Sequence, residues 1–157
     1  MQRFAPLLAV IGLLLILALM YGPQAYRNWT FQRDVETMLA AARSGNTAGM
    51  VANVDPGQQA EAKRIFDAYL PADYAQRIDR LTLSGGEDGA RSGRYALVTC
   101  RMSESSNVVI YQGKLLWKWN GKHWTWDFGA SQAAPLSLSG DTQWYKLSDI
   151  LEEARAY

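Results

Sequence analysis

The sequence predicts an α+β protein in which a membrane-spanning helix precedes a domain of about three helices, an antiparallel sheet of about four strands and a short C-terminal helix. Three observations support this fold class. An uncharged apolar run covers residues 4–21, apolar residues recur at helical spacing between residues 28 and 77, and they alternate from residue 78 onwards. The length of 157 residues favours one domain, and the net charge of +1 does not indicate a nucleic-acid partner.

Residues 4–21 have the composition of a membrane anchor. At about 1.5 Å per residue they span roughly 27 Å, close to the hydrocarbon thickness of a bilayer, and Tyr26 and Trp29 follow as interfacial aromatic residues. A cleaved signal peptide is the alternative, but the run is longer than a typical signal core and the small-residue cleavage pattern is poor. We therefore expect residues 4–21 to cross the lipid bilayer and residues 22–30 to form a short junction.

The charges on either side of the apolar run bear on its orientation. Arg3 stands on one side and Arg27 and Arg33 on the other, so the count of positive charges is nearly equal. The N-terminal tail is very short and the domain follows the helix. This order favours a cytoplasmic N-terminus and an extracytoplasmic domain, either periplasmic or at the cell surface.

The first half of the domain is expected to be helical. An apolar stripe predicts a helix over residues 28–44, and a short second helix is expected at 47–53. The sequence Asp55-Pro56-Gly57-Gln58 has the pattern of a helix start, which predicts a third helix over 56–70. A further helical turn is expected at 72–77.

Alternation of apolar residues predicts four strands, and a final helix closes the chain. The strands are expected at 78–84, 93–103, 107–119 and 123–131, separated by turn-forming sequences. Residues 132–143 have the composition of a loop. The stripe of the final helix, expected at 146–156, consists of Leu147, Ile150, Leu151 and Ala154.

Four of the six tryptophans lie in the tryptophan hairpin, which we define as residues 115–128. Asn120-Gly121 predicts its turn. A two-residue loop would pair Trp119 with Lys122, whereas a four-residue loop would pair Trp119 with Trp124. Both registers place one apolar set on a single face: Leu115, Trp117, Trp119, Trp124, Trp126 and Phe128. They place Lys114, Leu116, Lys118, His123, Thr125 and Asp127 on the other. We expect the first face to form core, with room for a pocket at its rim.

Three segments together resemble the nuclear transport factor 2-like superfamily. They are FQRDVETMLAAARSGNTAGMVANV, LPADYAQRIDRLTL and KLLWKWNGKHWTWDF, which lie within residues 28–131. The resemblance implies a cone-like domain with a curved sheet, behind an anchor and junction at 1–27 and before a C-terminal extension at 132–157. That superfamily includes isomerases, dehydratases, binding modules and anchored subunits of bacterial secretion or conjugation assemblies, so the fold does not decide the function.

The sequence provides few candidates for chemistry. The only histidine, His123, is expected on the outward face of the hairpin with Asp127. Asp34, Glu36 and Asp67 fall outside the apolar stripes, so no carboxylate is expected to point inward. The chain has one cysteine, Cys100, and no clustered metal ligands, so no cofactor or metal is expected.

These observations favour a non-catalytic single-pass membrane protein whose domain is an interaction or assembly module with protein partners in a membrane complex. The alternative is a small-ligand-binding or enzymatic pocket, lined by Tyr69, Tyr111, Trp117 and Trp126. A third possibility is a glycan platform, which requires exposed indoles. Lys114, Lys118 and Lys122 are expected to be solvated, and contact with anionic lipid is their functional alternative.

Overall fold

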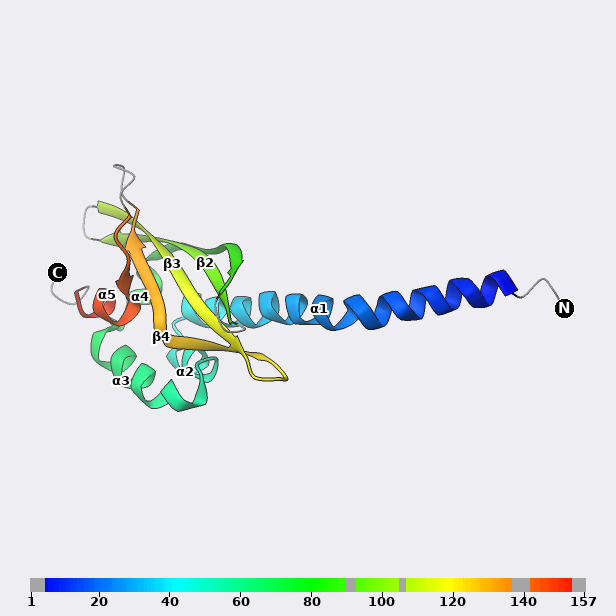
Figure 1. Cartoon of the computed structure of the whole chain (residues 1–157). Helices are drawn as coiled ribbons and strands as arrows, with labels where there is room; N and C mark the ends of the chain where they lie inside the picture. Colours follow the sequence, from blue (N-terminus) through cyan, green and yellow to red (C-terminus); the bar gives the residue numbers. More distant parts are fainter. Residues whose placement is uncertain (1–4, 90–92, 105–106, 137–141, 154–157) are drawn as a thin grey trace.

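The chain folds as a long N-terminal helix followed by an α+β domain (Figure 1). A computed structural model describes residues 5–89, 93–104, 107–136 and 142–153. The helices are α1 (Ala5–Arg43), α2 (Thr47–Ala52), the 3₁₀ turn η1 (Pro56–Gln58), α3 (Gln59–Tyr69), α4 (Tyr74–Arg77) and α5 (Leu147–Glu153). The strands are β1 (Ile78–Asp88), β2 (Gly93–Glu104), β3 (Asn107–Trp119), β4 (Trp124–Pro135) and β5 (Tyr145–Lys146).

Helix α1 is continuous through residues 22–30, which were expected to form a short junction. Pro23 lies inside the helix, where it removes one backbone donor without ending the helix. Four residues after Tyr26, the fully buried Thr30 donates its hydroxyl to the carbonyls of Tyr26 (2.9 Å) and Arg27 (3.0 Å). The helix therefore passes from its apolar part into the domain without a flexible break.

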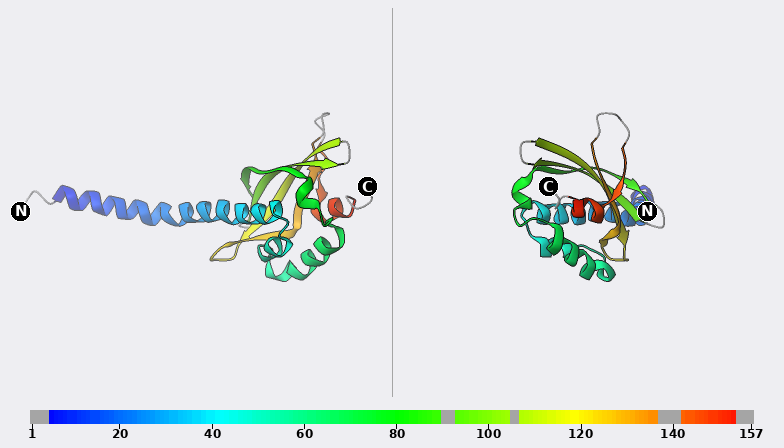
Figure 2. Two further views of the ribbon diagram at one scale, coloured as in Figure 1. Left: turned by 180° about the vertical axis from the view of Figure 1, so that it is seen from behind. Right: turned by 90° about the vertical axis from the view of Figure 1, so that its left-hand side faces the viewer.

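The N-terminal part of α1 projects away from the domain (Figures 1 and 2). Leu13, Leu15 and Leu19 are exposed there, with Leu19 77% exposed. Within the described chain, α1 is the one helix that is long and apolar enough to cross a membrane. Its C-terminal part is different, because Phe31, Val35 and the following stripe are buried in the domain.

The sheet is open and antiparallel, with strand order β1-β2-β3-β4-β5. It contains five strands among the described residues, where about four were expected. Strand β4 continues to Pro135, so the start of the expected 132–143 loop is wrong: Gln132 and Ala133 pair with Lys146 and Tyr145 of β5. The Ser, Ala and Gly composition suggested a loop. Ala133 and Ala134 are instead buried in the sheet, where small side chains fit.

The C-terminal helix starts one residue later than expected, at Leu147. It ends at Glu153 within the described residues, and Ala154 and the remainder of the expected helix lie outside them. Helix α5 packs against β4 and α3 (Figure 1). It therefore closes one end of the space between the sheet and the helices.

The tryptophan hairpin has the four-residue loop. Trp119 pairs with Trp124 and Trp117 with Trp126. The Asn120 side-chain oxygen accepts hydrogen bonds from the backbone N–H groups of Lys122 (3.0 Å) and His123 (2.9 Å), and Gly121 has a φ of +99°. The Asn120 carboxamide thus organises the loop, and the two-residue alternative is excluded.

The apolar face of the hairpin forms core, as expected. Trp117, Trp124, Trp126 and Phe128 are each at least 95% buried, since their exposed fractions are 0%, 5%, 2% and 4%. Phe31 of α1 meets Trp124 edge to face at 5.2 Å between ring centroids, and Phe66 of α3 stacks on Trp126 at 6.2 Å. The helices and the inner face of the sheet bury each other through these contacts.

The opposite face of the hairpin differs from the expectation, because Thr125 and Asp127 are also buried. The chain between α2 and η1 runs along the edge of β4 there, and Gln58 of η1 contacts Asp127. The backbone N–H of Trp126 donates to the carbonyl of Asn53 (2.8 Å), and the backbone N–H of Asp55 donates to the carbonyl of Trp126 (2.9 Å). Alternation along the strand was right, but it could not reveal that a second segment packs along the edge of β4.

Candidate functional site

A cavity of about 460 Å³ lies between the helices and the sheet, and we call it the inner cavity. The end of α1 contributes Met38, Leu39 and Ala42 to its wall. The sheet contributes Leu81, Val98, Cys100, Met102 and Leu115, and α5 contributes Leu147, Ile150 and Leu151. The stripe of α5 therefore faces a hollow that the sequence could not place.

Three of the four residues expected to line a pocket line the inner cavity. Tyr69 approaches from the end of α3, Tyr111 from β3 and Trp126 from β4. Trp117 does not line it, because its side chain is fully buried in the core. Sequence reasoning missed Tyr145 of β5, since its strand was expected to be a loop.

The polar groups of the inner cavity are few. The Tyr74 hydroxyl, which is buried, donates to the sulfur of Met50 at 3.4 Å. Arg77 reaches the rim, where its Nε donates to a carboxylate oxygen of Asp73 at 3.0 Å. This hydrogen bond lowers the pKa of the Asp73 carboxyl. Gln112 of β3 also lines the cavity and contributes an amide.

Cys100 is the only thiol of the chain and lies in the cavity wall. Burial raises the pKa of this thiol to about 11, because an apolar environment disfavours the thiolate. A protonated thiol is a poor nucleophile and a poor metal ligand. In this part of the structure Cys100 therefore acts as a small apolar wall residue.

The inner cavity suits an apolar molecule better than acid–base chemistry. None of the residues described as lining it is an aspartate, a glutamate or a histidine. Across the described ranges, no three such side chains or cysteines come together as a metal site. The arrangement can exclude water from an apolar group and offer a few hydrogen bonds at its rim.

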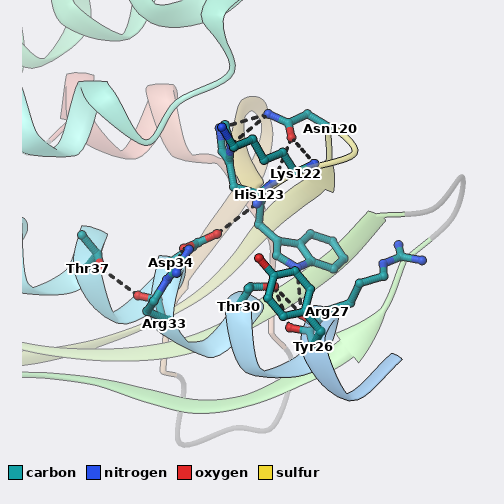
Figure 3. Close-up of polar contacts among 10 residues, drawn as sticks. Tyr26, Arg27, Thr30, Arg33, Asp34, Thr37, Asn120, Lys122 and His123 are labelled. Atoms are coloured by element: carbon teal, nitrogen blue, oxygen red, sulfur yellow. Dashed lines mark hydrogen bonds and ion pairs between the residues drawn. The ribbon is translucent and has the colours of Figure 1, made fainter. Parts of the chain in front are cut away.

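A second hollow, of about 340 Å³, lies between α1 and the tip of the tryptophan hairpin (Figure 3). We call it the hairpin cleft. Tyr26 and Arg33 of α1, Asn53 after α2, and Lys122 and His123 of the hairpin tip contribute to its lining. Its lining is more polar than that of the inner cavity and includes two cationic side chains, Arg33 and Lys122, and one acid, Asp34.

Asp34 also lines the hairpin cleft, although it was expected on an outward helix face. It is only 8% exposed. One carboxylate oxygen accepts from Arg33 Nε (2.9 Å) and Nη2 (2.7 Å), and the other accepts from the backbone N–H of Trp124 (3.0 Å). The carboxylate therefore joins α1 to the hairpin (Figure 3) and does not face the inner cavity.

Asp127 has a similar structural role on β4. Its carboxylate pairs with Lys118 and accepts from Gln58 Nε2 at 2.8 Å. Burial alone would raise the pKa of Asp127, but the hydrogen bonds from Lys118 and Gln58 outweigh it and lower the pKa. Asp127 is buried there, although it was expected on the outward face of the hairpin.

Three of the four hairpin tryptophans offer no ring face to a glycan. Trp117, Trp124 and Trp126 are buried, and the Trp124 indole N–H donates to the carbonyl of Arg27 at 2.9 Å. Stacking on a sugar requires an exposed ring face, which these three side chains lack.

Comparison of the chain with protein-family models, with curated proteins and with solved structures finds no match.

Proposed function

We propose that this chain is a membrane-anchored, non-catalytic binding module that holds a small apolar molecule in its inner cavity. The cavity itself is the observation that supports this function. Its volume of about 460 Å³ falls within the range of roughly 300–1,000 Å³ that is usual for ligand pockets. Its wall of leucine, methionine, valine and aromatic side chains favours binding of an apolar group over proton transfer.

The proposal gives a quantitative expectation for a series of straight-chain alcohols. Burial of one methylene group contributes about 0.8 kcal/mol, which corresponds to about a fourfold change in affinity. Affinity should therefore increase about fourfold per added carbon until the chain fills the cavity. Longer alcohols should then gain nothing.

Alkylation of Cys100, which lies in the cavity wall, reports whether the cavity is occupied. The full chain, reconstituted in phosphatidylcholine nanodiscs, is treated with iodoacetamide with and without hexanol, octanol or decanol, and alkylation is followed by mass spectrometry. A bound alcohol should protect Cys100. The cavity-filling substitutions Leu81→Trp and Leu151→Trp, from opposite walls, should abolish protection, whereas Val108→Trp, at a site 51% exposed, should preserve it.

Equal alkylation with and without every alcohol would reject the proposal. So would protection that persists in both cavity-filling variants, since the alcohol would then act elsewhere. Circular dichroism of each variant shows whether it is folded. The use of two variants from different walls keeps the test decisive if one fails to fold.

The membrane anchor and its orientation belong to the same proposal. The long apolar helix α1, whose N-terminal part packs against no other described element, supports insertion in a bilayer. We propose a cytoplasmic N-terminus and an extracytoplasmic domain. Protease digestion of sealed membrane vesicles tests this, and digestion of the domain only from the cytosolic side would reject it.

The relationship to the nuclear transport factor 2-like superfamily is likewise a proposal. It is supported by the order of helices followed by an antiparallel sheet and by the hollow between them. A cone-like shape is part of that proposal. An experimental structure that superposes on this superfamily's helices and strands in chain order would support it.

Assembly in a membrane complex is the second candidate function. The outer edge of β1 favours it, because β1 pairs with β2 alone among the described strands and edge strands can accept a partner strand. Arg43 blocks one position by donating to the carbonyl of Leu81 at 2.6 and 2.9 Å. Affinity purification from detergent extract tests this, and a monomer with no stoichiometric partner would reject it.

A further inference from the structure

The hairpin cleft lies at the end of the domain where α1 leaves it. No charged residue occurs between Phe4 and Tyr26, and Arg27 is the first charged residue after the apolar run. The carbonyl of Arg27 accepts the Trp124 indole N–H, so the Trp124 side chain reaches that turn of the helix, while the Trp124 backbone N–H donates to Asp34, about two turns further into the domain. Tyr26 and Trp29, 52% and 58% exposed, belong to the same turn as Arg27.

This position corresponds to the headgroup layer of a bilayer. Tyr26, which lines the cleft, follows the apolar run 4–21 by five residues, a distance of about 7.5 Å along a helix. The headgroup layer occupies roughly 5–8 Å on each side of the hydrocarbon. Because α1 is continuous, no linker separates the hairpin from this layer.

The cleft carries positive charge that the described protein does not neutralise. Lys122 and His123 are exposed at the hairpin tip, and the Arg33 side chain is 49% exposed. The acid of the cleft, Asp34, has both oxygens engaged by Arg33 and the Trp124 N–H. Lys122 forms no ion pair with any acid that the structure describes.

The backbone of the hairpin tip, the His123 ring and the Arg33 guanidinium are held in place before any ligand arrives. Asn120 accepts from the N–H groups of Lys122 and His123, and its Nδ2 donates to His123 Nε2 at 3.0 Å (Figure 3). Arg33 binds Asp34 through Nε and Nη2, which leaves Nη1 for another acceptor. Guanidinium, ammonium and imidazole donors around one hollow match the oxygens of a phosphate group.

We infer that the hairpin cleft binds the phosphate of an anionic phospholipid headgroup, an inference that rests on the proposed membrane anchoring. The ammonium of Lys122 and the guanidinium of Arg33 contact the phosphate oxygens, and Tyr26 lies at the interface beside them. The lipid fixes the hairpin, and therefore the domain, against the bilayer. A positive charge near an anionic membrane contributes about 1 kcal/mol.

Native mass spectrometry of the full chain in detergent, with equimolar phosphatidylglycerol and phosphatidylcholine, tests this inference. The chain should retain one phosphatidylglycerol in preference to phosphatidylcholine. Lys122→Gln should reduce this retention at least fivefold, because it removes an exposed charge at the cleft. Lys146→Gln is the matched control, since Lys146 is exposed on β5 and does not line the cleft, and it should change nothing.

Equal retention of the two lipids, or full retention by Lys122→Gln, would overturn the inference. A second arm adds inorganic phosphate and follows the imidazole signals of His123, the only histidine. A phosphate-induced shift without any preference for phosphatidylglycerol would assign the cleft to a free anion and also overturn it. Carbonate extraction tests anchoring separately, so a chain that stays in the membrane without a lipid preference refutes only this inference.

Discussion

Trp117 and Trp126 are neighbouring buried tryptophans whose indole N–H groups differ in their partners. Trp126 Nε1 donates to the Ser131 hydroxyl at 2.8 Å. Trp117 Nε1 is buried and has no acceptor among the residues that the structure describes. Sequence alternation placed both side chains on the core face, but it could not show which indole N–H finds a partner, because that depends on a serine five residues further along a distorted strand.

Replacing each tryptophan by phenylalanine should therefore have unequal effects. Both substitutions leave a similar void, but Trp126→Phe also loses a hydrogen bond, whereas Trp117→Phe removes an unsatisfied donor. We expect Trp126→Phe to lower the free energy of unfolding by about 2 kcal/mol more than Trp117→Phe. Urea denaturation of both variants measures this difference, and equal losses would contradict the assignment of the two N–H groups.

The alkylation of Cys100 should depend on pH in a distinctive way. With a pKa of about 11 instead of the ordinary value of 9.0, the thiolate fraction below pH 9 is about 100-fold lower than for a solvated thiol. The rate with iodoacetamide should rise about tenfold per pH unit from pH 7 to 10. In the urea-unfolded control the rate should level off near pH 9, and a similar plateau in the folded chain would contradict the burial of Cys100.

Strand β4 shows where element-level reasoning succeeds and where it ends. Apolar periodicity predicted α3, the paired strands and the inward face of the tryptophan hairpin, because burial on one side leaves a regular pattern. It missed the bulge between Asp127 and Gln132, where the partner of β4 moves from Leu116 to Lys114. Residues 127–131 were expected to continue a regular strand, whereas the Ser131 hydroxyl there replaces a strand hydrogen bond by accepting from the Leu116 N–H.

Ser131 is the centre of that bulge and gives the test at this scale. Its fully buried hydroxyl accepts from the Leu116 N–H (3.0 Å) and from Trp126 Nε1, and it donates to the carbonyl of Asp127 (2.8 Å). Ser131→Ala leaves these buried groups unpaired, so we expect a loss of about 3 kcal/mol in unfolding free energy. Ser44→Ala, which removes an exposed hydrogen bond, should cost less than about 0.5 kcal/mol.

The whole molecule combines two hollows with opposite chemistry on one rigid support. The apolar inner cavity is formed at the C-terminal end of α1, and the polar hairpin cleft is formed about three turns nearer the N-terminus. The sequence predicted the helix stripe, the tryptophan face and three residues that line the inner cavity, but it did not predict the α5 wall of that cavity or the hairpin cleft. Each depends on segments distant in the chain, α5 for the cavity and residues 120–123 for the cleft.

Continuity of α1 has a measurable consequence for the distance between the domain and the bilayer. Seven helix-forming residues inserted after Ala25 should lengthen a continuous helix by about 10.5 Å while nearly preserving its rotation. A fluorophore on Lys122→Cys, in a Cys100→Ser background and in nanodiscs, should then be quenched markedly less by headgroup-labelled lipid. A seven-residue glycine–serine insert is the control, because a flexible junction lets the cleft return to the surface. If the helical insert left quenching unchanged, α1 would have to bend at Gly22-Pro23, and the rigid connection between anchor and domain would be refuted.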